Sequence, residues 1–237
     1  MTYEAKKAII LAAGFGSRMV PVTLDIPKPL VKVHGTRIID TLLDALLEAG
    51  IEDITIVRGY KKECFEELLP KYPGLKFIDN PLYDSTNSIS SALAALDILE
   101  GGCYVCEADL LIANPEVIRK YHAGSDYLGS FARETEDWCL SEKDGYATDY
   151  RKGGTECFNC YGISFWTPED CDYLREDIRE VWEENGGKDV FWEFVPLVLR
   201  KENYQVRIHE CQKADVVEID SFQELIALDP TYKHYKR

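Results

Sequence analysis

Long apolar runs, basic residues and histidine are scarce in this 237-residue sequence, and each scarcity excludes a class of protein. No run approaches the roughly 18 to 20 apolar residues that a membrane-spanning helix needs. The formal charge of −15 at pH 7 repels phosphate backbones, which argues against nucleic acid as a partner. The four histidines are scattered and form no Ser/His/Asp or Cys/His arrangement, so we assign no role to His34, His122, His209 and His234.

Eight cysteines are too few for a disulfide-stabilised secreted scaffold of this length. Lys6 and Lys7 precede a short apolar stretch that superficially resembles an export signal, but glycines and Arg18 interrupt that stretch at once. We therefore expect reduced thiols in a soluble, cytoplasmic protein. Cys157-x-x-Cys160 has no second ligand pair at a suitable spacing, which favours ordinary thiols over a zinc site.

Short apolar runs alternate with amphipathic stretches in the first half of the chain. This alternation predicts crossover units and a mostly parallel, mixed sheet flanked by helices, hence an α/β fold. The predicted strands cover 7–12, 53–57, 75–78 and 103–107, and the helices 37–49, 61–69 and 88–99. The second half is less regular, with strands over 127–133, 146–150, 160–166, 204–209 and 216–219 and helices over 168–184, 189–199 and 222–228. Because no linker or repeat interrupts the chain, we expect a single domain over 1–237 with a decorated, more antiparallel C-terminal part.

A glycine-rich loop directly after the first predicted strand is the strongest local signal. It runs Leu-Ala-Ala-Gly-Phe-Gly-Ser-Arg-Met over 11–19. Glycines at such a place let the backbone approach a ligand closely and point its N–H groups at phosphate. The loop is not a complete dinucleotide fingerprint, since Met19 stands where the third glycine belongs, and it lacks the Gly-Lys-Ser/Thr of a P-loop. A tight structural turn is the alternative, and we favour a phosphate site.

Two cations flank the proline-rich loop that follows. Arg18 and Lys28 stand out in an otherwise acidic protein. Fixed cations beside a glycine-rich loop neutralise a triphosphate and the charge that develops during phosphate transfer. Ordinary surface charge is the alternative role of both residues.

The stretch from Leu11 to Gly35 resembles the signature of nucleotidyltransferases. It reads Leu-Ala-Ala-Gly-x-Gly-Ser-Arg-Met-x-Pro-x-Thr over 11–23 and Pro-Lys-Pro-Leu-Val-x-Val-x-Gly over 27–35. The resemblance implies a Rossmann-like nucleotidyltransferase fold whose N-terminal half binds the nucleotide. It also implies that Arg18 and Lys28 are catalytic and contact the triphosphate and the transferred group. The implied nucleotide-binding residues are Leu11, Ala12, Ala13, Gly14, Gly16, Ser17, Gly59, Tyr60, Asn87 and Ser88.

Two aspartates directly follow predicted strands. Asp109 follows the strand over 103–107, and Asp220 follows the strand over 216–219. Taken singly, each is typical of a helix cap or a solvated turn. The resemblance implies instead that both hold a metal ion, and Mg²⁺ prefers carboxylate oxygens. The nucleophile is then the acceptor's own phosphate, which is largely ionised at neutral pH and needs no general base.

The C-terminal half is expected to hold the acceptor. Trp138, Asp189, Phe191 and Trp192 are of the types that bind a quaternary ammonium with aromatic faces and a carboxylate, although such a cluster is more often plain core. Over its whole length the chain is most similar to the bacterial CTP:phosphocholine cytidylyltransferases, in which matching residues surround choline. That resemblance implies transfer of CMP from CTP to phosphocholine, giving CDP-choline and pyrophosphate.

Two departures from that family keep other acceptors open. Glu107-Ala108-Asp109 stands where those enzymes carry Asp-Ala-Asp, and Thr86-Asn87-Ser88 resembles related enzymes that load CMP onto 2-aminoethylphosphonate. A sugar 1-phosphate with another nucleotide is a further alternative. A non-catalytic nucleotide-binding module is the alternative of a different class, and the joint presence of the two cations and the two aspartates argues against it.

Overall fold

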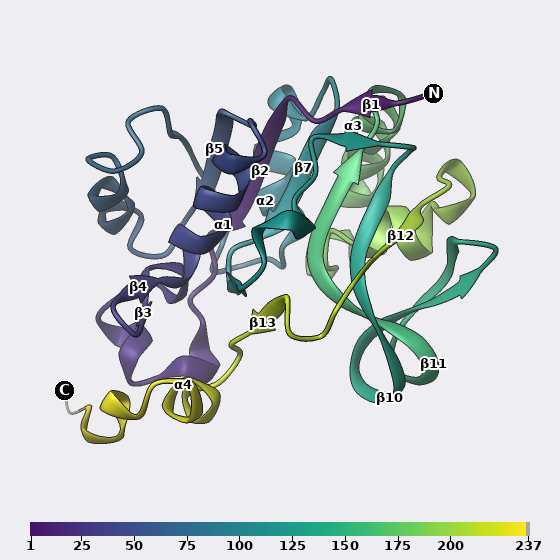
Figure 1. Cartoon of the computed structure of the whole chain (residues 1–237). Helices are drawn as coiled ribbons and strands as arrows, with labels where there is room; N and C mark the ends of the chain where they lie inside the picture. Colours follow the sequence, from purple (N-terminus) through teal and green to yellow (C-terminus); the bar gives the residue numbers. More distant parts are fainter. Residues whose placement is uncertain (236–237) are drawn as a thin grey trace.

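A computed structural model describes residues 1–235, so the last two positions of the predicted domain, 236–237, lie outside the described residues. A seven-stranded mixed sheet with the order β10-β12-β11-β7-β2-β5-β6 forms its centre (Figure 1). The strands are β1 (Tyr3–Glu4), β2 (Lys7–Ala12), β3 (Lys32–Val33), β4 (Thr36–Arg37), β5 (Asp53–Arg58), β6 (Lys76–Asp79), β7 (Cys103–Glu107), β8 (Leu110–Ile112), β9 (Tyr121–His122), β10 (Asp126–Lys143), β11 (Tyr146–Trp166), β12 (Arg207–Cys211) and β13 (Val216–Glu218). The α-helices are α1 (Ile38–Glu48), α2 (Ile89–Ala94), α3 (Pro168–Glu183) and α4 (Phe222–Leu228). The predicted α/β class with a mixed sheet is confirmed.

The parallel half of the sheet consists of β7, β2, β5 and β6. β2 is buried over its last five residues, as a continuous apolar run predicts for a strand covered on both faces. Alternate residues of β2 point into two different cores: Ile10 packs toward α1, whereas Ile9 packs toward α2 and α3. Figure 1 shows α1 on one side of these strands and α2 and α3 on the other. The carboxyl ends of the parallel strands therefore meet along one edge, between two helical layers.

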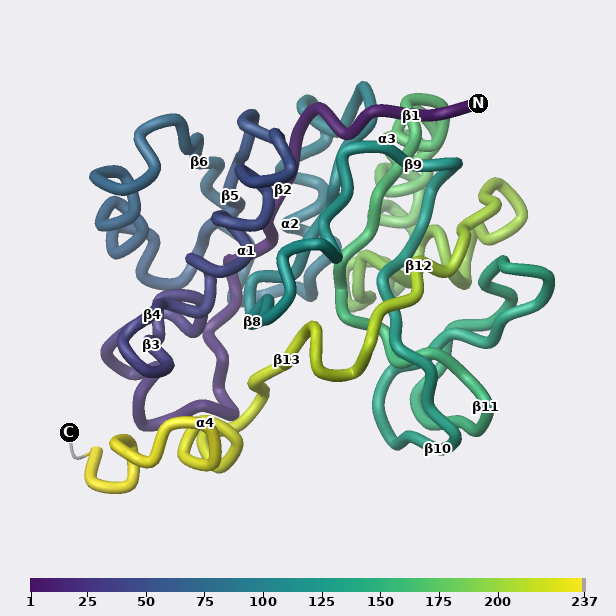
Figure 2. The backbone as a smooth tube through the Cα atoms, in the orientation of Figure 1, coloured from purple at the N-terminus to yellow at the C-terminus, as the bar shows by residue number. Residues whose placement is uncertain are grey.

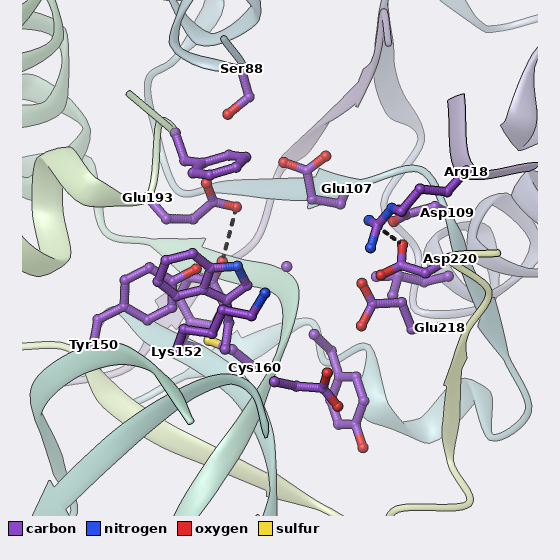
Figure 3. Close-up of a pocket in the computed structure, with 17 residues that line it drawn as sticks. Arg18, Ser88, Glu107, Asp109, Tyr150, Lys152, Cys160, Glu193, Glu218 and Asp220 are labelled. Atoms are coloured by element: carbon purple, nitrogen blue, oxygen red, sulfur yellow. Dashed lines mark hydrogen bonds and ion pairs between the residues drawn. The ribbon is translucent and has the colours of Figure 1, made fainter. Parts of the chain in front are cut away.

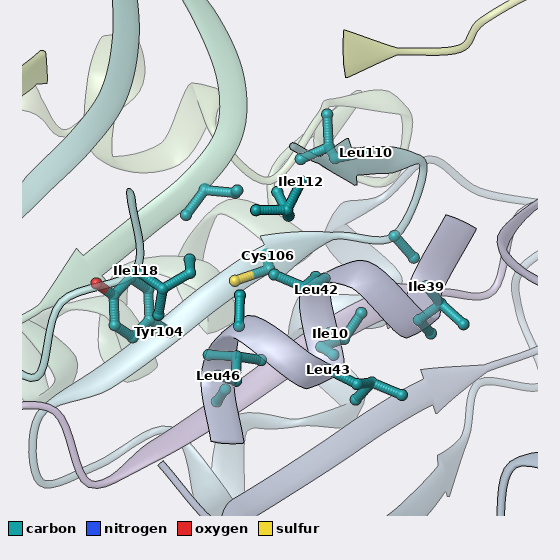
Figure 4. Packing of buried hydrophobic residues seen from close by; sticks show 14 of the residues in the cluster. Ile10, Ile39, Leu42, Leu43, Leu46, Tyr104, Cys106, Leu110, Ile112 and Ile118 are labelled. Carbon is teal, nitrogen blue, oxygen red and sulfur yellow. The ribbon is translucent and has the colours of Figure 1, made fainter. Parts of the chain in front are cut away.

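Helix α1 anchors one face of the sheet. Its apolar residues recur at helical spacing, and Ile39, Leu42, Leu43 and Leu46 are each at most 1% exposed. They pack on Ile10 and on neighbouring residues of β7 and β8 (Figure 4). This core fixes the positions at which β2 and β7 end, and those ends carry the glycine-rich loop and Asp109.

The second half of the chain differs from the three short strands predicted over 127–133, 146–150 and 160–166. Two long antiparallel strands, β10 and β11, run through these segments and through the polar stretches that were expected to be turns. Their register is irregular from Thr135 to Glu142. The hairpin extends beyond the sheet (Figure 1), where much of it is exposed, so polar residues cost a strand little there.

The helix predicted over 189–199 is wrong. The chain there forms a 3₁₀ turn over Gly187–Asp189 and a π-helical turn over Val195–Leu199. Peptide groups of this segment also bond to residues just before α2: Asn87 N–H donates to the Lys188 carbonyl at 2.9 Å, and Trp192 N–H donates to Ser88 Oγ at 3.0 Å. These tertiary hydrogen bonds replace the local helix.

Smaller differences concern the ends and types of other elements. The helix predicted over 61–69 is a 3₁₀ helix over Lys62–Leu68, and the helix over 88–99 divides into α2 and a 3₁₀ turn over Leu96–Ile98. The strand predicted over 204–209 is displaced to β12. Further 3₁₀ turns cover Ser17–Met19, Val22–Leu24, Lys28–Leu30, Pro115–Val117, Lys201–Asn203 and Pro230–His234. Within residues 1–235, every helix is too short or too polar to cross a membrane.

The C-terminal segment returns to the N-terminal half of the molecule. β13 pairs antiparallel with β8 outside the main sheet, and the chain then continues into α4 (Figure 2). Ile219 and Leu225 are buried against Met19 and Val31, and Ser221 and Glu224 form a capping box at the start of α4. The chain thereby carries residues 218–220 to the carboxyl end of β7.

The burial of His209, a residue with no assigned role in the chemistry, predicts that the fold becomes less stable in acid. It is 5% exposed, and burial lowers its pKa from 6.5 to about 4. Unfolded chains bind a proton at this position below about pH 6.5 whereas the folded protein does not, so stability is lost as the pH falls from 6.5 toward 4. At pH 5 the loss is about 2 kcal/mol.

Urea unfolding of the protein and of His209→Gln at pH 7 and pH 5 measures this effect. The difference in unfolding free energy between wild type and variant is the quantity to compare, because Glu193 and Glu218 have raised pKa values and respond to pH in the opposite direction. A difference that stays constant between the two pH values contradicts the prediction.

Candidate active site

A cluster of two cations and two aspartates lies at the carboxyl ends of β7 and β13. Lys28 Nζ lies 2.7 Å from Asp109 Oδ2 and 3.0 Å from Asp220 Oδ1. Arg18 Nη2 reaches the same Asp220 oxygen at 2.9 Å. The Ile219 N–H donates to the Asp109 carbonyl at 3.4 Å, which ties the two strand ends together. The structure thus brings together all four residues that the sequence marks for phosphate and metal binding.

The glycine-rich loop determines how Lys28 enters this cluster. Gly16 has a φ of +68°, and a Cβ there would lie 3.0 Å from Lys28 Cβ and 3.3 Å from Thr23 Cγ2. Thr23 in turn donates a hydrogen bond to the Gly16 carbonyl at 3.0 Å. Lys28 is 8% exposed; burial lowers its pKa, but the carboxylates of Asp109 and Asp220 more than offset this and raise the pKa above its usual value. Lys28 is therefore a buried, fully charged ammonium.

Glu218 is a third acid of the cluster. Carboxylate oxygens of Asp109, Glu218 and Asp220 all lie within 4.8 Å of one another. Glu218 is an exposed residue, but its carboxyl group loses hydration within the cluster and is repelled by the two aspartates, which together raise its pKa to about 8. Three carboxylates at this separation form a donor set that suits a hard divalent cation.

The residues predicted to bind the nucleotide lie along the same edge of the sheet. Leu11, Ala12 and Ala13 are buried at the end of β2, and the Ala13 carbonyl accepts the N–H of Tyr60, just past β5, at 2.9 Å. Space around Gly14 is open, with nothing within 4 Å of its Cβ position. The remaining members of the set line this edge from the loop and from the residues after β5: Gly16, Ser17 and Gly59.

The other two predicted nucleotide residues connect the halves of the molecule. Asn87 Nδ2 donates to the Asp189 carbonyl at 3.1 Å, and Ser88 Oγ accepts the N–H of Trp192. Ser88 also lines the cavity described next. These two residues thus hold the segment around 189–192 in place.

A cavity of about 260 Å³ extends from the cation–carboxylate cluster toward the β10/β11 hairpin (Figure 3). Arg18, Asp109, Glu218 and Asp220 lie at one end, and the other lining residues surround the space beyond them. These others are Ser88, Glu107, Leu110, Tyr127, Asp137, Trp138, Tyr150, Lys152, Cys160, Tyr161, Gly162, Phe191 and Glu193. The far part of the cavity therefore carries aromatic rings and several acids.

Two of the four residues predicted to surround the acceptor line this cavity. Trp138 stacks on Tyr150 with ring centroids 5.0 Å apart and an interplanar angle of 21°, and Phe191 meets the Trp138 ring edge-on at 6.0 Å. Trp192 lies elsewhere: it is 1% exposed and packs on Trp166 in the core between the sheet and α3. Asp189 is exposed and outside the cavity lining, because its segment forms a 3₁₀ turn rather than a helix start.

Two glutamates line the cavity beyond the cluster: Glu107, which is half-buried, and Glu193, which is buried. Glu193 raises the pKa of Glu107 and Glu107 lowers that of Glu193, so the two side chains lie close together, and Tyr127 Oη donates to Glu193 Oε1 at 3.5 Å. Burial raises the pKa of Glu193 to about 7 and that of Glu107 well above its usual value. Gly162, with a φ of +62°, lies against Glu107: a Cβ there would be 2.6 Å from Glu107 Cγ.

Residues 8–150 match the family of MobA-like NTP transferase domains. The chain belongs to this family. The transferase is 36% identical over 237 residues to the 2-aminoethylphosphonate cytidylyltransferase of Lancefieldella rimae, covering 99% of this chain and 96% of the relative. It is 31% identical over 221 residues to the choline-phosphate cytidylyltransferase of Haemophilus influenzae, covering 92% and 93% of the two chains.

A solved structure of the CTP:phosphocholine cytidylyltransferase from Streptococcus pneumoniae superposes on the transferase with a TM-score of 0.86. The two chains are 29% identical over 95% of this chain and 98% of the other. The predicted nucleotidyltransferase fold is therefore confirmed, and with it the resemblance to bacterial choline-phosphate and related cytidylyltransferases.

Sequence reasoning missed several cavity residues of this transferase. Glu193 directly follows a tryptophan that was expected to face the acceptor, and Glu218 lies two residues before Asp220. The alternation of side chains along β13 offered a signal for Glu218, since residues 218 and 220 share one side of an extended chain. Tyr127 and Tyr150 carried no local signal, because their place in the cavity depends on how the long hairpin packs.

Proposed function

We propose that this transferase moves CMP from CTP to a small phosphonate or phosphate that carries an ammonium group, and that 2-aminoethylphosphonate is its acceptor. Nucleotidyltransferase activity of the cytidylyltransferase type is supported by full-length relatives. In the proposal, the N-terminal half binds CTP and the C-terminal half binds the acceptor.

The distribution of charge in the cavity carries the proposal. Lys28 and Arg18 lie at one end and suit phosphate groups, whereas Glu107 and Glu193 line the cavity beyond them and suit a cation. Among the described residues that line that part, Lys152 is a single cation and Asp137 adds a third acid. An acceptor with an anionic and a cationic end matches both. A sugar 1-phosphate has no cation to offset the buried acids, which disfavours that alternative.

Phosphocholine is the second candidate acceptor. Trp138 and Phe191 in the cavity lining favour phosphocholine, because aromatic faces attract a quaternary ammonium. The similarity to the pneumococcal structure also favours it. 2-Aminoethylphosphonate is favoured by the higher identity of its relative over nearly the whole chain. It is also favoured by the buried carboxyl groups, which can accept hydrogen bonds that a quaternary ammonium cannot donate.

We further propose that Asp109, Glu218 and Asp220 hold Mg²⁺, a cation whose preferred ligands are such oxygens. When bound, Mg²⁺ supplies charge neutralisation at the triphosphate. An ionised oxygen of the acceptor attacks the α-phosphorus of CTP, the bond to the bridging oxygen breaks, and pyrophosphate leaves. Arg18 and Lys28 bind phosphate oxygens and stabilise the charge that develops on them, and the acceptor needs no general base.

Pyrophosphate release from CTP tests the proposed function. We would measure it with 2-aminoethylphosphonate, phosphocholine, phosphoethanolamine and glucose 1-phosphate in parallel, and with UTP in place of CTP. Preferred turnover of the aminophosphonate is the expected result. Preference for phosphocholine would replace the acceptor and keep the reaction class, whereas turnover of none of them would overturn the proposal.

Replacing the two tryptophans separately distinguishes an acceptor contact from a core contact. Trp138→Ala is expected to raise the acceptor KM about tenfold with little change in stability, because a half-exposed ring that contacts the cation is lost. Trp192→Ala is expected to destabilise the protein by about 3 to 5 kcal/mol, since it empties a site in the core. Steady-state kinetics together with urea unfolding of both variants measure the two effects. A Trp192→Ala variant of normal stability but poor acceptor affinity would contradict this assignment.

A further inference from the structure

The carboxyl pair of Glu107 and Glu193 has no counter-charge of its own. Lys28 bridges Asp109 and Asp220, and Arg18 pairs with Asp220. A third cation, Lys152, also lines the cavity. Within residues 1–235 neither glutamate forms an ion pair. The two carboxyl groups line the same cavity, so a cation that enters it can contact oxygens of both.

Hydrogen bonding distinguishes the kinds of cation that such a pair can accept. A primary ammonium carries three N–H donors, so it needs several oxygen acceptors in one place. Glu107 and Glu193 supply carboxyl oxygens from two directions, and the hydroxyl of Tyr127 lies beside them, within 3.5 Å of Glu193. Leaving a buried polar group without a hydrogen-bond partner costs more free energy than a hydrogen bond at the surface contributes. A site with several such acceptors therefore discriminates strongly between a ligand that donates to them and one that cannot.

The aromatic residues of the cavity offer a quaternary ammonium few free ring faces, because neighbouring rings cover them. Tyr150 covers one face of Trp138, and Phe194 meets the same indole edge-on with centroids 5.5 Å apart. Trp192, which would extend an aromatic box, lies in the core. A trimethylated cation in this cavity would place methyl groups against the two carboxyl groups and leave them without donors.

We propose that Glu107 and Glu193 are the specificity-determining residues of the acceptor site, selecting a primary ammonium over a quaternary one by accepting its N–H hydrogen bonds. The inference rests on the proposed function and deepens it. Gly162 leaves the space that the Glu107 side chain occupies, because a Cβ at position 162 would lie 2.9 Å from Glu107 Cβ and 2.6 Å from its Cγ. Gly162 is accordingly a positioning residue, without a direct contact to the ammonium.

A series of N-methylated acceptors tests the proposal. kcat/KM is measured by pyrophosphate release for 2-aminoethylphosphonate and for its N-methyl, N,N-dimethyl and N,N,N-trimethyl forms. In the wild type, the trimethyl form is expected to be at least about 100-fold poorer than the primary amine. In Glu193→Gln and in Glu107→Gln, the ratio of kcat/KM for the primary amine to kcat/KM for the trimethyl form is expected to fall about tenfold. The main cause is a higher KM for the primary amine. Gly162→Ala keeps both acids but displaces Glu107. It is expected to lower the same kcat/KM ratio and to leave CTP binding, measured by calorimetry, unchanged.

Glu176→Gln is the matched control, since this exposed residue of α3 undergoes the same loss of charge outside the cavity. A ratio that stays at its wild-type value in both glutamate variants, in proteins of normal CTP affinity and unfolding midpoint, overturns the inference and leaves the proposed function standing. A wild type that prefers the trimethyl form also overturns it. Absence of turnover with every member of the series overturns the proposed function and this inference together.

Discussion

Asp109→Asn is expected to lower kcat by on the order of a thousandfold while leaving the fold intact. The side chain lies at the end of β7 within the group of three carboxylates, and its Oδ2 also accepts the Lys28 ammonium at 2.7 Å. An amide keeps the shape but removes the charge, so both the proposed cation site and the orientation of Lys28 are weakened. Losing a preorganised charge of this kind costs about 10² to 10³ in turnover. Pyrophosphate release at saturating CTP and acceptor measures the loss.

A matched change elsewhere separates this effect from a general loss of negative charge. The side chain of Asp97 is fully exposed and its nearest ion pair, with Arg179, is 3.9 Å long, so Asp97→Asn should retain wild-type turnover. Thermal unfolding of both variants checks that the fold is kept. Undiminished turnover in Asp109→Asn would refute the proposed metal site, and it would reopen the alternative of a module that binds nucleotide without catalysis.

The elements that were predictable from the sequence are those whose signals are local. The buried strand β2, the glycine-rich loop after it and Lys28 lie within some twenty consecutive positions, and the loop's own contacts at Gly16 hold Lys28 in place. Helix α1 was equally visible, because its apolar face follows from its own spacing. Asp109 became a candidate because it follows a buried strand, where ligands bind in an α/β sheet, and the family resemblance then implied its role in metal binding.

The acceptor side was less predictable because it is made by contacts between distant segments. Trp192 and Phe191 are neighbours in sequence, yet one is buried in the core and the other lines the cavity. Their segment adopts this conformation because Asn87 and Ser88, about a hundred residues earlier, bond to it. Glu107 and Glu193 likewise meet only after β7 and the segment before the π-helical turn are packed together. No pattern within either segment contains that information.

Lys28→Met is expected to reduce kcat by about 10² to 10³ and, in the same protein, to strengthen the binding of a divalent cation in the absence of nucleotide. The first effect follows from removing a buried ammonium that would otherwise bind phosphate oxygens. The second follows from the two contacts of 2.7 and 3.0 Å by which the ammonium occupies Asp109 and Asp220. Without it, Asp109 and Asp220 lose the positive charge that offsets their mutual repulsion, so an added cation gains about tenfold or more in affinity.

Binding of Mn²⁺ to the nucleotide-free protein, followed by electron paramagnetic resonance, measures the second effect independently of catalysis. Lys6→Met is the control, because Lys6 is an exposed residue directly before β2, at the opposite end of that strand from the loop. Lys28→Met is also expected to unfold at a lower temperature than wild type without metal and to recover much of the difference when Mg²⁺ is added. If instead the variant bound Mn²⁺ more weakly than wild type, the ammonium would be supporting the cation site rather than competing for it. The expectation that Lys28 and a divalent cation compete for Asp109 and Asp220 would then be wrong.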